Sequence, residues 1–119
     1  MPKIMLAEDD PTMITLLETL LGMEGYQVVS LGIYDDVLES VRNDRPDVLL
    51  LDVHLSNANG LDVLTQLKSD DETKDLSVVM TSGLNVEDEC INSGANGFLL
   101  KPYMPDDLLE VLKRNLDHS

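Results

Sequence analysis

Short apolar runs alternate with segments of helical periodicity along the whole chain. The runs predict β-strands at Ile4–Ala7, Gln27–Leu31, Val48–Asp52, Ser77–Thr81 and Gly97–Leu100. The run Val48–Asp52 is almost purely aliphatic, which is typical of a parallel strand buried on both faces of a sheet. Regular alternation of such strands with helices predicts an α/β domain in which helices cover a parallel sheet.

Helical periodicity follows each predicted strand. After the first strand, Asp10 is a suitable N-cap and Pro11 fits the first position of a helix. Its expected apolar face comprises Met13, Ile14, Leu16, Leu17, Leu20 and Leu21, and the segment from Gly22 to Gly25 should end the helix. Further helices are expected near Asp35–Asn43, across Leu61, Leu64 and Leu67, near Val86–Asn92 and near Asp106–Leu116.

Polar side chains stand at the carboxyl ends of four predicted strands. Three acids, residues 8–10, follow the first strand, Asp52 ends the third, Thr81 and Ser82 end the fourth, and Lys101 follows the fifth. Because parallel strands bring their carboxyl ends to one edge, we expect these side chains to meet there. Carboxylate oxygens are ligands that Mg²⁺ prefers, and without a cation they would repel one another. Asp52 is therefore a candidate nucleophile for phosphoryl transfer, with Lys101 and a hydroxyl to contact the phosphoryl oxygens.

Composition and charge narrow the class of function. The 119 residues suffice for one domain, and 23 acidic against 8 basic residues give a net charge of −15. Such a surface repels nucleic acid phosphates and anionic membranes, so we expect no direct binding to either. There is no run long enough to span a bilayer and no signal peptide pattern, so we expect no membrane insertion. The single cysteine, Cys90, is expected to be a half-buried helix residue, and its lack of a partner fits a cytoplasmic location.

The order of these motifs resembles the receiver domains of two-component response regulators. The matching residues are Glu8-Asp9, Asp52, Gly60, Ser82-Gly83, Gly94-Ala95, Phe98 and Lys101-Pro102. The resemblance covers the whole chain and implies one receiver domain over residues 1–119 with no output domain. It also implies a five-stranded, doubly wound parallel sheet of flavodoxin-like order 2-1-3-4-5 with helices on both faces.

The resemblance implies a role for each matching residue. Asp52 would accept a phosphoryl group from a histidine kinase or a phosphotransfer protein. Ser82 and Lys101 would contact the phosphoryl oxygens. Mg²⁺ would be held by Asp9, Asp52, the backbone carbonyl of His54 and, mainly through a water, Glu8.

The resemblance further implies a switch. Phe98 stands where the family has its switch aromatic, whose ring moves inward as the hydroxyl residue is drawn to the phosphate. Lys101-Pro102 would carry a cis peptide bond. Phosphorylation would change the surface of the fourth helix, fifth strand and fifth helix to regulate an unknown downstream protein. The domain would then dephosphorylate itself, and it would not act as an enzyme on an external metabolite.

Some positions leave a choice or depart from the family. Alternation along the fourth strand allows only one of Thr81 and Ser82 to face the site, and spacing from Asp52 together with the small Gly83 favours Ser82. Ser56 replaces a proline that the family often has four residues after the phosphoacceptor. His54 is expected to be an exposed loop residue without a role; the alternatives are that it tunes the approach of the hydrolytic water or binds a metal.

Three alternatives remain beside the phosphorylation switch. The main one is a receiver-like module that docks partners without being phosphorylated. A phosphatase with an aspartate nucleophile usually has a second aspartate two residues on, where this chain has His54. A flavin-binding electron carrier of similar topology would need a loop that accepts phosphate, and the three acids at residues 8–10 would repel it.

Overall fold

The computed structural model describes residues 1–32 and 35–116 as a five-stranded parallel sheet flanked by helices. The strands are β1 (Lys3–Ala7), β2 (Gln27–Ser30), β3 (Val48–Asp52), β4 (Ser77–Ser82) and β5 (Gly97–Leu100). The helices are α1 (Pro11–Met23), α2 (Val37–Asp44), α3 (Gly60–Ser69), α4 (Glu87–Asn92) and α5 (Pro105–Leu116). The strand order is β2-β1-β3-β4-β5, all pairs being parallel, which confirms the predicted doubly wound sheet.

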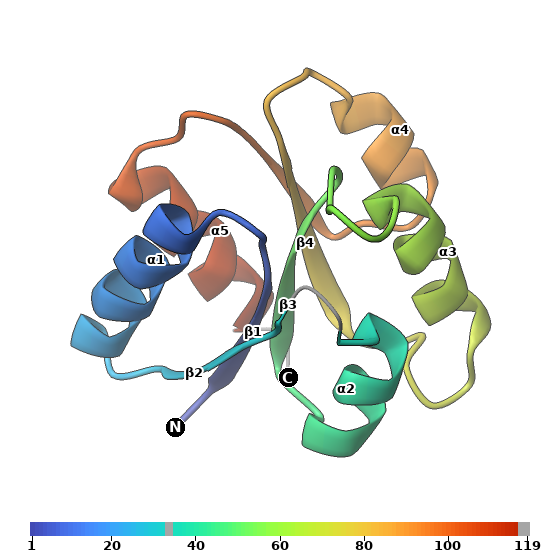
Figure 1. Ribbon diagram of the computed structural model, residues 1–119, viewed down its shortest axis with the longest axis horizontal. Helices are drawn as coiled ribbons and strands as arrows, with labels where there is room; N and C mark the ends of the chain where they lie inside the picture. The colour runs from blue at the N-terminus through green and yellow to red at the C-terminus, as the bar shows by residue number, and fades with distance from the viewer. Residues whose placement is uncertain (33–34, 117–119) are drawn as a thin grey trace.

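Two hydrophobic layers enclose the sheet (Figure 1). Helices α1 and α5 cover one face, and α2, α3 and α4 cover the other. Successive side chains of β3 alternate between the layers: Val48 and Leu50 pack toward α1 and α5, and Leu49 and Leu51 pack toward the other three helices. All five residues of β3 are buried, so this central strand ends with Asp52 held inside the protein.

The ends of the first two helices follow from local chemistry. The Asp10 side chain accepts hydrogen bonds from the backbone N–H groups of Thr12 and Met13, at 2.9 and 3.4 Å, and Pro11 is the first helical residue as predicted. Helix α2 begins at residue 37, later than predicted, because Asp36 serves as its N-cap. The strands β2 and β4 differ from the prediction by one residue at their carboxyl ends.

Two predictions about burial were wrong. Leu16 was expected on the buried face of α1, but 57% of it is exposed, whereas Leu17 and Leu21 are buried. Apolar residues cover more than one side of α1, and the sheet meets only one of them. Cys90 was expected to be half-buried, yet it is fully enclosed in the layer under α4. Within residues 1–32 and 35–116, no helix combines the length and apolar character required to cross a membrane.

Candidate functional site

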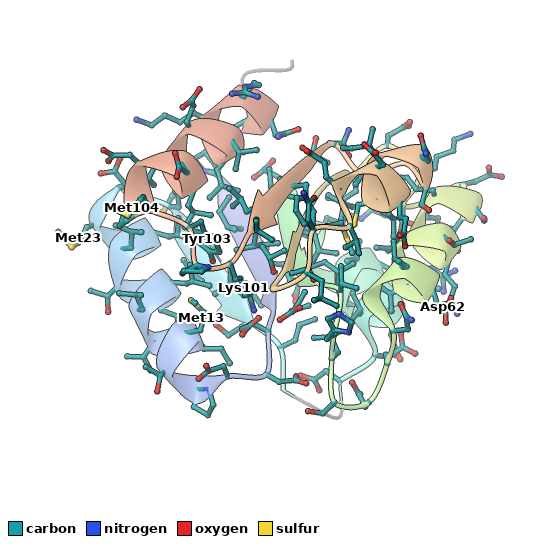
Figure 2. All side chains as sticks on the ribbon, turned by 90° about the horizontal axis from the view of Figure 1, so that it is seen from above. Met13, Met23, Asp62, Lys101, Tyr103 and Met104 are labelled. Atoms are coloured by element: carbon teal, nitrogen blue, oxygen red, sulfur yellow. The ribbon has the colours of Figure 1, made fainter. Side chains whose placement is uncertain are left out.

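Lys101 joins two carboxylates at the carboxyl edge of the sheet. Its Nζ atom lies 2.6 Å from Oδ2 of Asp52 and 3.1 and 3.3 Å from the two carboxylate oxygens of Glu8. Glu8 follows β1, Asp52 ends β3 and Lys101 follows β5, so the sheet order assembles three distant parts of the chain. In Figure 2 the lysine lies near the centre of the molecule, beside Tyr103 of the same segment. The structure therefore brings together three of the predicted site residues.

Backbone contacts set the position of Asp52. Its Oδ1 atom accepts a hydrogen bond from the backbone N–H of His54 at 3.0 Å. Gly60, the first residue of α3, donates its N–H to the carbonyl of Val53 at 2.7 Å. A Cβ atom at Gly60 would lie only 2.3 Å from the carbonyl oxygen of Asp52, so the close approach of α3 to this strand end requires glycine.

The position of Lys101 is also set by the backbone. Its N–H donates to the carbonyl of Ser82 at 2.8 Å, which ties the start of the β5–α5 connection to the end of β4. The peptide bond between Lys101 and Pro102 is cis, as predicted. Tyr103 comes next, half-buried, and its hydroxyl lies 3.9 Å from the sulfur of Met13 on α1 (Figure 2). Burial raises the pKa of Tyr103 to about 12, so it stays neutral beside the charged site.

The charges at this edge are unbalanced, with two carboxylates for one ammonium. Glu8 and Asp52 are each only 8% exposed. Burial, together with the hydrogen bond to Asp52, raises the pKa of Glu8 to about 7 despite the contact with Lys101. Burial alone would raise the pKa of Asp52, but hydrogen bonds with Glu8 and Lys101 outweigh it and lower that pKa. Burial likewise opposes the charge on Lys101, and its bonds to the two carboxylates outweigh this and raise its pKa.

Asp9 does not join this group. Its Oδ2 atom accepts a hydrogen bond from the backbone N–H of Ser56, in the loop after β3. It also lines a small hollow with Glu8, Asp35 and Asn57, a hollow that Asp52 does not line. In the described part of the chain, no three carboxylate, imidazole or thiol side chains converge closely enough to hold a metal ion. Of the predicted carboxylate cluster, Glu8 and Asp52 therefore share the contact with Lys101, and Asp9 makes a separate contact with the loop after β3.

The hydroxyl residues of β4 differ in their surroundings. Ser82 is fully buried, and its Oγ atom accepts a hydrogen bond from the N–H of Leu84 at 3.0 Å. In the sheet register Asp52 is paired with Thr81, so alternation places the Thr81 side chain on the same face as Asp52 and Ser82 on the other. The structure thus places Ser82 at the site's edge through its backbone contact with Lys101, while its hydroxyl is engaged elsewhere.

Phe98 and His54 are the remaining two predicted site residues. Phe98 of β5 is half-buried, lies opposite Met80 in the register and packs into the layer under α4. His54 is exposed, and the contact it makes with Asp52 uses its backbone N–H. Sequence reasoning missed the contribution of the Ser56 amide. The sequence did contain a signal for this contact, because any residue other than proline at position 56 supplies a backbone N–H.

Comparisons with known proteins agree with this arrangement. A family model described as the response regulator receiver domain matches residues 4–113. The DNA-binding response regulator MtrA of Mycolicibacterium smegmatis is 31% identical over 116 residues, which cover 96% of this chain and 50% of that protein. The chain therefore spans about half the length of the curated relatives it matches.

Two solved structures are similar over nearly the whole chain. A putative response regulator from Chloroflexus aurantiacus J-10-fl has a TM-score of 0.89 and 28% identity, covering 98% of both chains. The receiver domain of the sensor histidine kinase PA1611 from Pseudomonas aeruginosa PAO1 has a TM-score of 0.84 and 25% identity, covering 97% of both chains. That receiver holds a magnesium ion coordinated in its active site cleft. Because the family model matches residues 4–113, this chain belongs to the response regulator receiver domain family.

Proposed function

We propose that this chain is a phosphorylation switch in which Asp52 accepts a phosphoryl group from a histidine kinase or a phosphotransfer protein. The observation that carries the proposal is the contact of Lys101 Nζ with both Asp52 and Glu8 at the carboxyl edge of the sheet. An Asp52 carboxylate oxygen attacks phosphorus, the bond from phosphorus to the donor's imidazole nitrogen breaks, and an aspartyl phosphate forms. Lys101 then neutralises a phosphoryl oxygen as it now neutralises the carboxylates.

The donor set of the site suits Mg²⁺. Two buried carboxyl groups, those of Glu8 and Asp52, contact the single ammonium group of Lys101. Carboxylate oxygens are hard ligands of the kind this ion selects. Asp9, Asp52 and the backbone carbonyl of His54 would hold it, with Glu8 acting mainly through a water. When bound, the cation would offset the charge that develops on the transferring phosphoryl group.

The switch itself would work through Ser82 and Phe98. The Ser82 hydroxyl accepts a hydrogen bond from the N–H of Leu84, which starts the β4–α4 connection, so movement of Ser82 toward a phosphoryl oxygen would pull on that connection. Phe98 packs under α4, so movement of this connection would be transmitted to the α4–β5–α5 surface. That surface would regulate a downstream protein partner. Hydrolysis of the aspartyl phosphate by water would return the domain to its starting state, and no reaction on an external metabolite is proposed.

Intact mass spectrometry tests the phosphoacceptor. The protein is incubated with Mg²⁺ and acetyl phosphate beside an Asp52→Asn variant. The expected result is one added phosphoryl group that requires Mg²⁺, is absent from the variant, and decays after the donor is removed. If a folded sample takes no adduct, beryllofluoride binding distinguishes rapid hydrolysis from an inactive site. Failure of both would replace this proposal with the phosphorylation-independent docking module.

A pair of variants separates the two hydroxyl residues of β4. Ser82 lies one residue further along β4 than Thr81, at the level that a phosphoryl group extending beyond Asp52 would reach. We therefore expect Ser82→Ala to change the lifetime of the aspartyl phosphate and Thr81→Val to leave it close to wild type. The opposite pattern would assign the contact to Thr81, which shares the face of Asp52.

A further inference from the structure

We propose that the backbone amide of Ser56 holds the Oδ2 atom of Asp9 in the metal-free protein, so that Mg²⁺ binding through this oxygen requires the hydrogen bond to break. The inference rests on the proposed function, because it takes Asp9 as a ligand of the cation. It concerns a contact that has no part in the proposed phosphoryl transfer, namely the hydrogen bond from the Ser56 N–H to Oδ2 of Asp9.

The loop that carries Ser56 is anchored on both sides. His54 and Asn59 form an antiparallel bridge, and the N–H of Leu55 donates to the carbonyl of Ala58 at 3.2 Å. Ser56 is thus the first of two residues at the tip of a tight hairpin. The hairpin is joined directly to the buried end of β3 on one side and to the start of α3 on the other. Its amide therefore keeps its place when the Asp9 side chain moves, and the hydrogen bond is lost rather than carried along.

The position of Asp9 shows what this bond does. Asp9 and Glu8 are neighbours in the chain, yet only Glu8 reaches Lys101 and, through it, Asp52. Both Glu8 and Asp9 line a small hollow with Asp35, whose carboxylate would repel that of Asp9 if nothing compensated. The Ser56 N–H supplies that compensation, because hydrogen bonds to a carboxylate are about twice as strong as those between neutral groups.

Two consequences follow for the cation. A cation that binds Asp9 through Oδ2 competes with the Ser56 amide for that oxygen, so cation binding costs one charge-assisted hydrogen bond. Recruitment also releases the β3–α3 hairpin from the segment after β1. Cation occupancy is thereby coupled to the freedom of a loop that lies beside the phosphoacceptor.

The substitution Ser56→Pro removes the N–H, and Ser56→Ala is the matched control because it keeps it. Proline is well tolerated at the first tip residue of many turns. We expect Ser56→Pro to lower the Kd for Mg²⁺ by about tenfold, the size expected for losing one competing hydrogen bond to a charged group, with Ser56→Ala close to wild type. Mg²⁺ is titrated by calorimetry at physiological ionic strength, and circular dichroism verifies the fold of each variant.

A second measurement needs no substitution. In ¹⁵N-labelled wild-type protein, the Ser56 amide proton should lose its hydrogen-exchange protection when Mg²⁺ reaches saturation, because its acceptor leaves. Persistence of that protection, a folded Ser56→Pro variant with unchanged or weaker Mg²⁺ affinity, or an equal gain in Ser56→Ala would each overturn the inference. Failure of wild-type protein to bind Mg²⁺ at all would instead count against the proposed cation site, and the inference would fall with it.

Discussion

Replacing Gly60 with alanine should strongly destabilise the protein, because the new methyl group has no space. An ideal Cβ atom at this position would lie 2.3 Å from the carbonyl oxygen of Asp52, 2.7 Å from Cα of Val53 and 3.0 Å from the carbonyl carbon of Asp52. Ordinary van der Waals contacts between such atoms have separations of about 3.5 Å or more, so α3 and the end of β3 would have to move apart by roughly 1 Å. The atoms in contact are all backbone, and no side chain can rotate away.

This geometry allows the loss in free energy of unfolding to be estimated. Overpacking a well-packed interior lowers the free energy of unfolding by about 1–3 kcal/mol. A clash that only backbone movement relieves belongs at the upper end of this range, about 3 kcal/mol. For a domain of this length the loss corresponds to a decrease in Tm on the order of 10 °C. The same movement displaces Asp52, the proposed phosphoacceptor, so adduct formation with acetyl phosphate should slow as well.

Urea unfolding followed by far-UV circular dichroism measures the difference in free energy of unfolding between Gly60→Ala and wild type, provided that their m-values agree. Gly22→Ala is the matched control, since a Cβ atom there meets nothing within 4 Å and the residue lies inside α1. Its expected effect is a gain of up to about 1 kcal/mol from helix propensity. A Gly60→Ala variant within about 0.5 kcal/mol of wild type would refute the reasoning from the close backbone contact.

Three further outcomes are expected. Lys101→Ala should lower the free energy of unfolding by about 2 kcal/mol in metal-free buffer and by less with Mg²⁺ present. The reason is that a cation can replace the ammonium group between two buried carboxylates. Urea titrations with EDTA and with Mg²⁺ test this, and equal losses in the two buffers would contradict it. The pKa of Glu8 rises from 4.5 to about 7 on folding, so the folded state binds this proton more tightly, and the stability it provides is full below pH 4.5 and is lost as the pH rises through about 7. Thermal unfolding in EDTA should show that decline across this window, and Glu8→Gln should remove it. Asn96→Ala should cost about 2 kcal/mol in urea unfolding, because the buried N–H of Val78 loses its acceptor at 2.9 Å, whereas Asn96→Asp keeps that acceptor and should cost less.

Much of the candidate site could be placed from the sequence because its residues directly end or follow strands. Asp52 is the last residue of a strand buried on both faces, and Lys101 directly follows another. Once the strands are parallel, their carboxyl ends meet at one edge, so Glu8, Asp52 and Lys101 come together whatever the details of the loops. The assignments of Asp9, Ser82 and Phe98 to the cation, the phosphoryl group and the switch remain predictions.

Burial on the helices was harder to infer. The apolar residues of α1 are too numerous to define one face, and only the packed structure shows that Leu17 is buried and Leu16 exposed. Cys90 is enclosed because α4 packs closely on β5, a contact between elements that the periodicity of a six-residue helix cannot report.

The sequence by itself determined the parallel α/β sheet, the positions of its strands and the chemistry of its carboxyl edge, because hydrophobic periodicity and strand-end residues are local properties of the chain. Only the tertiary structure decided which partner each polar group has. Lys101 bridges Glu8 and Asp52, Asp9 is bound by the Ser56 amide, and Gly60 lies against the backbone of Asp52. These contacts join residues from different loops, and their geometry depends on how the helices pack against the sheet, which no local pattern encodes.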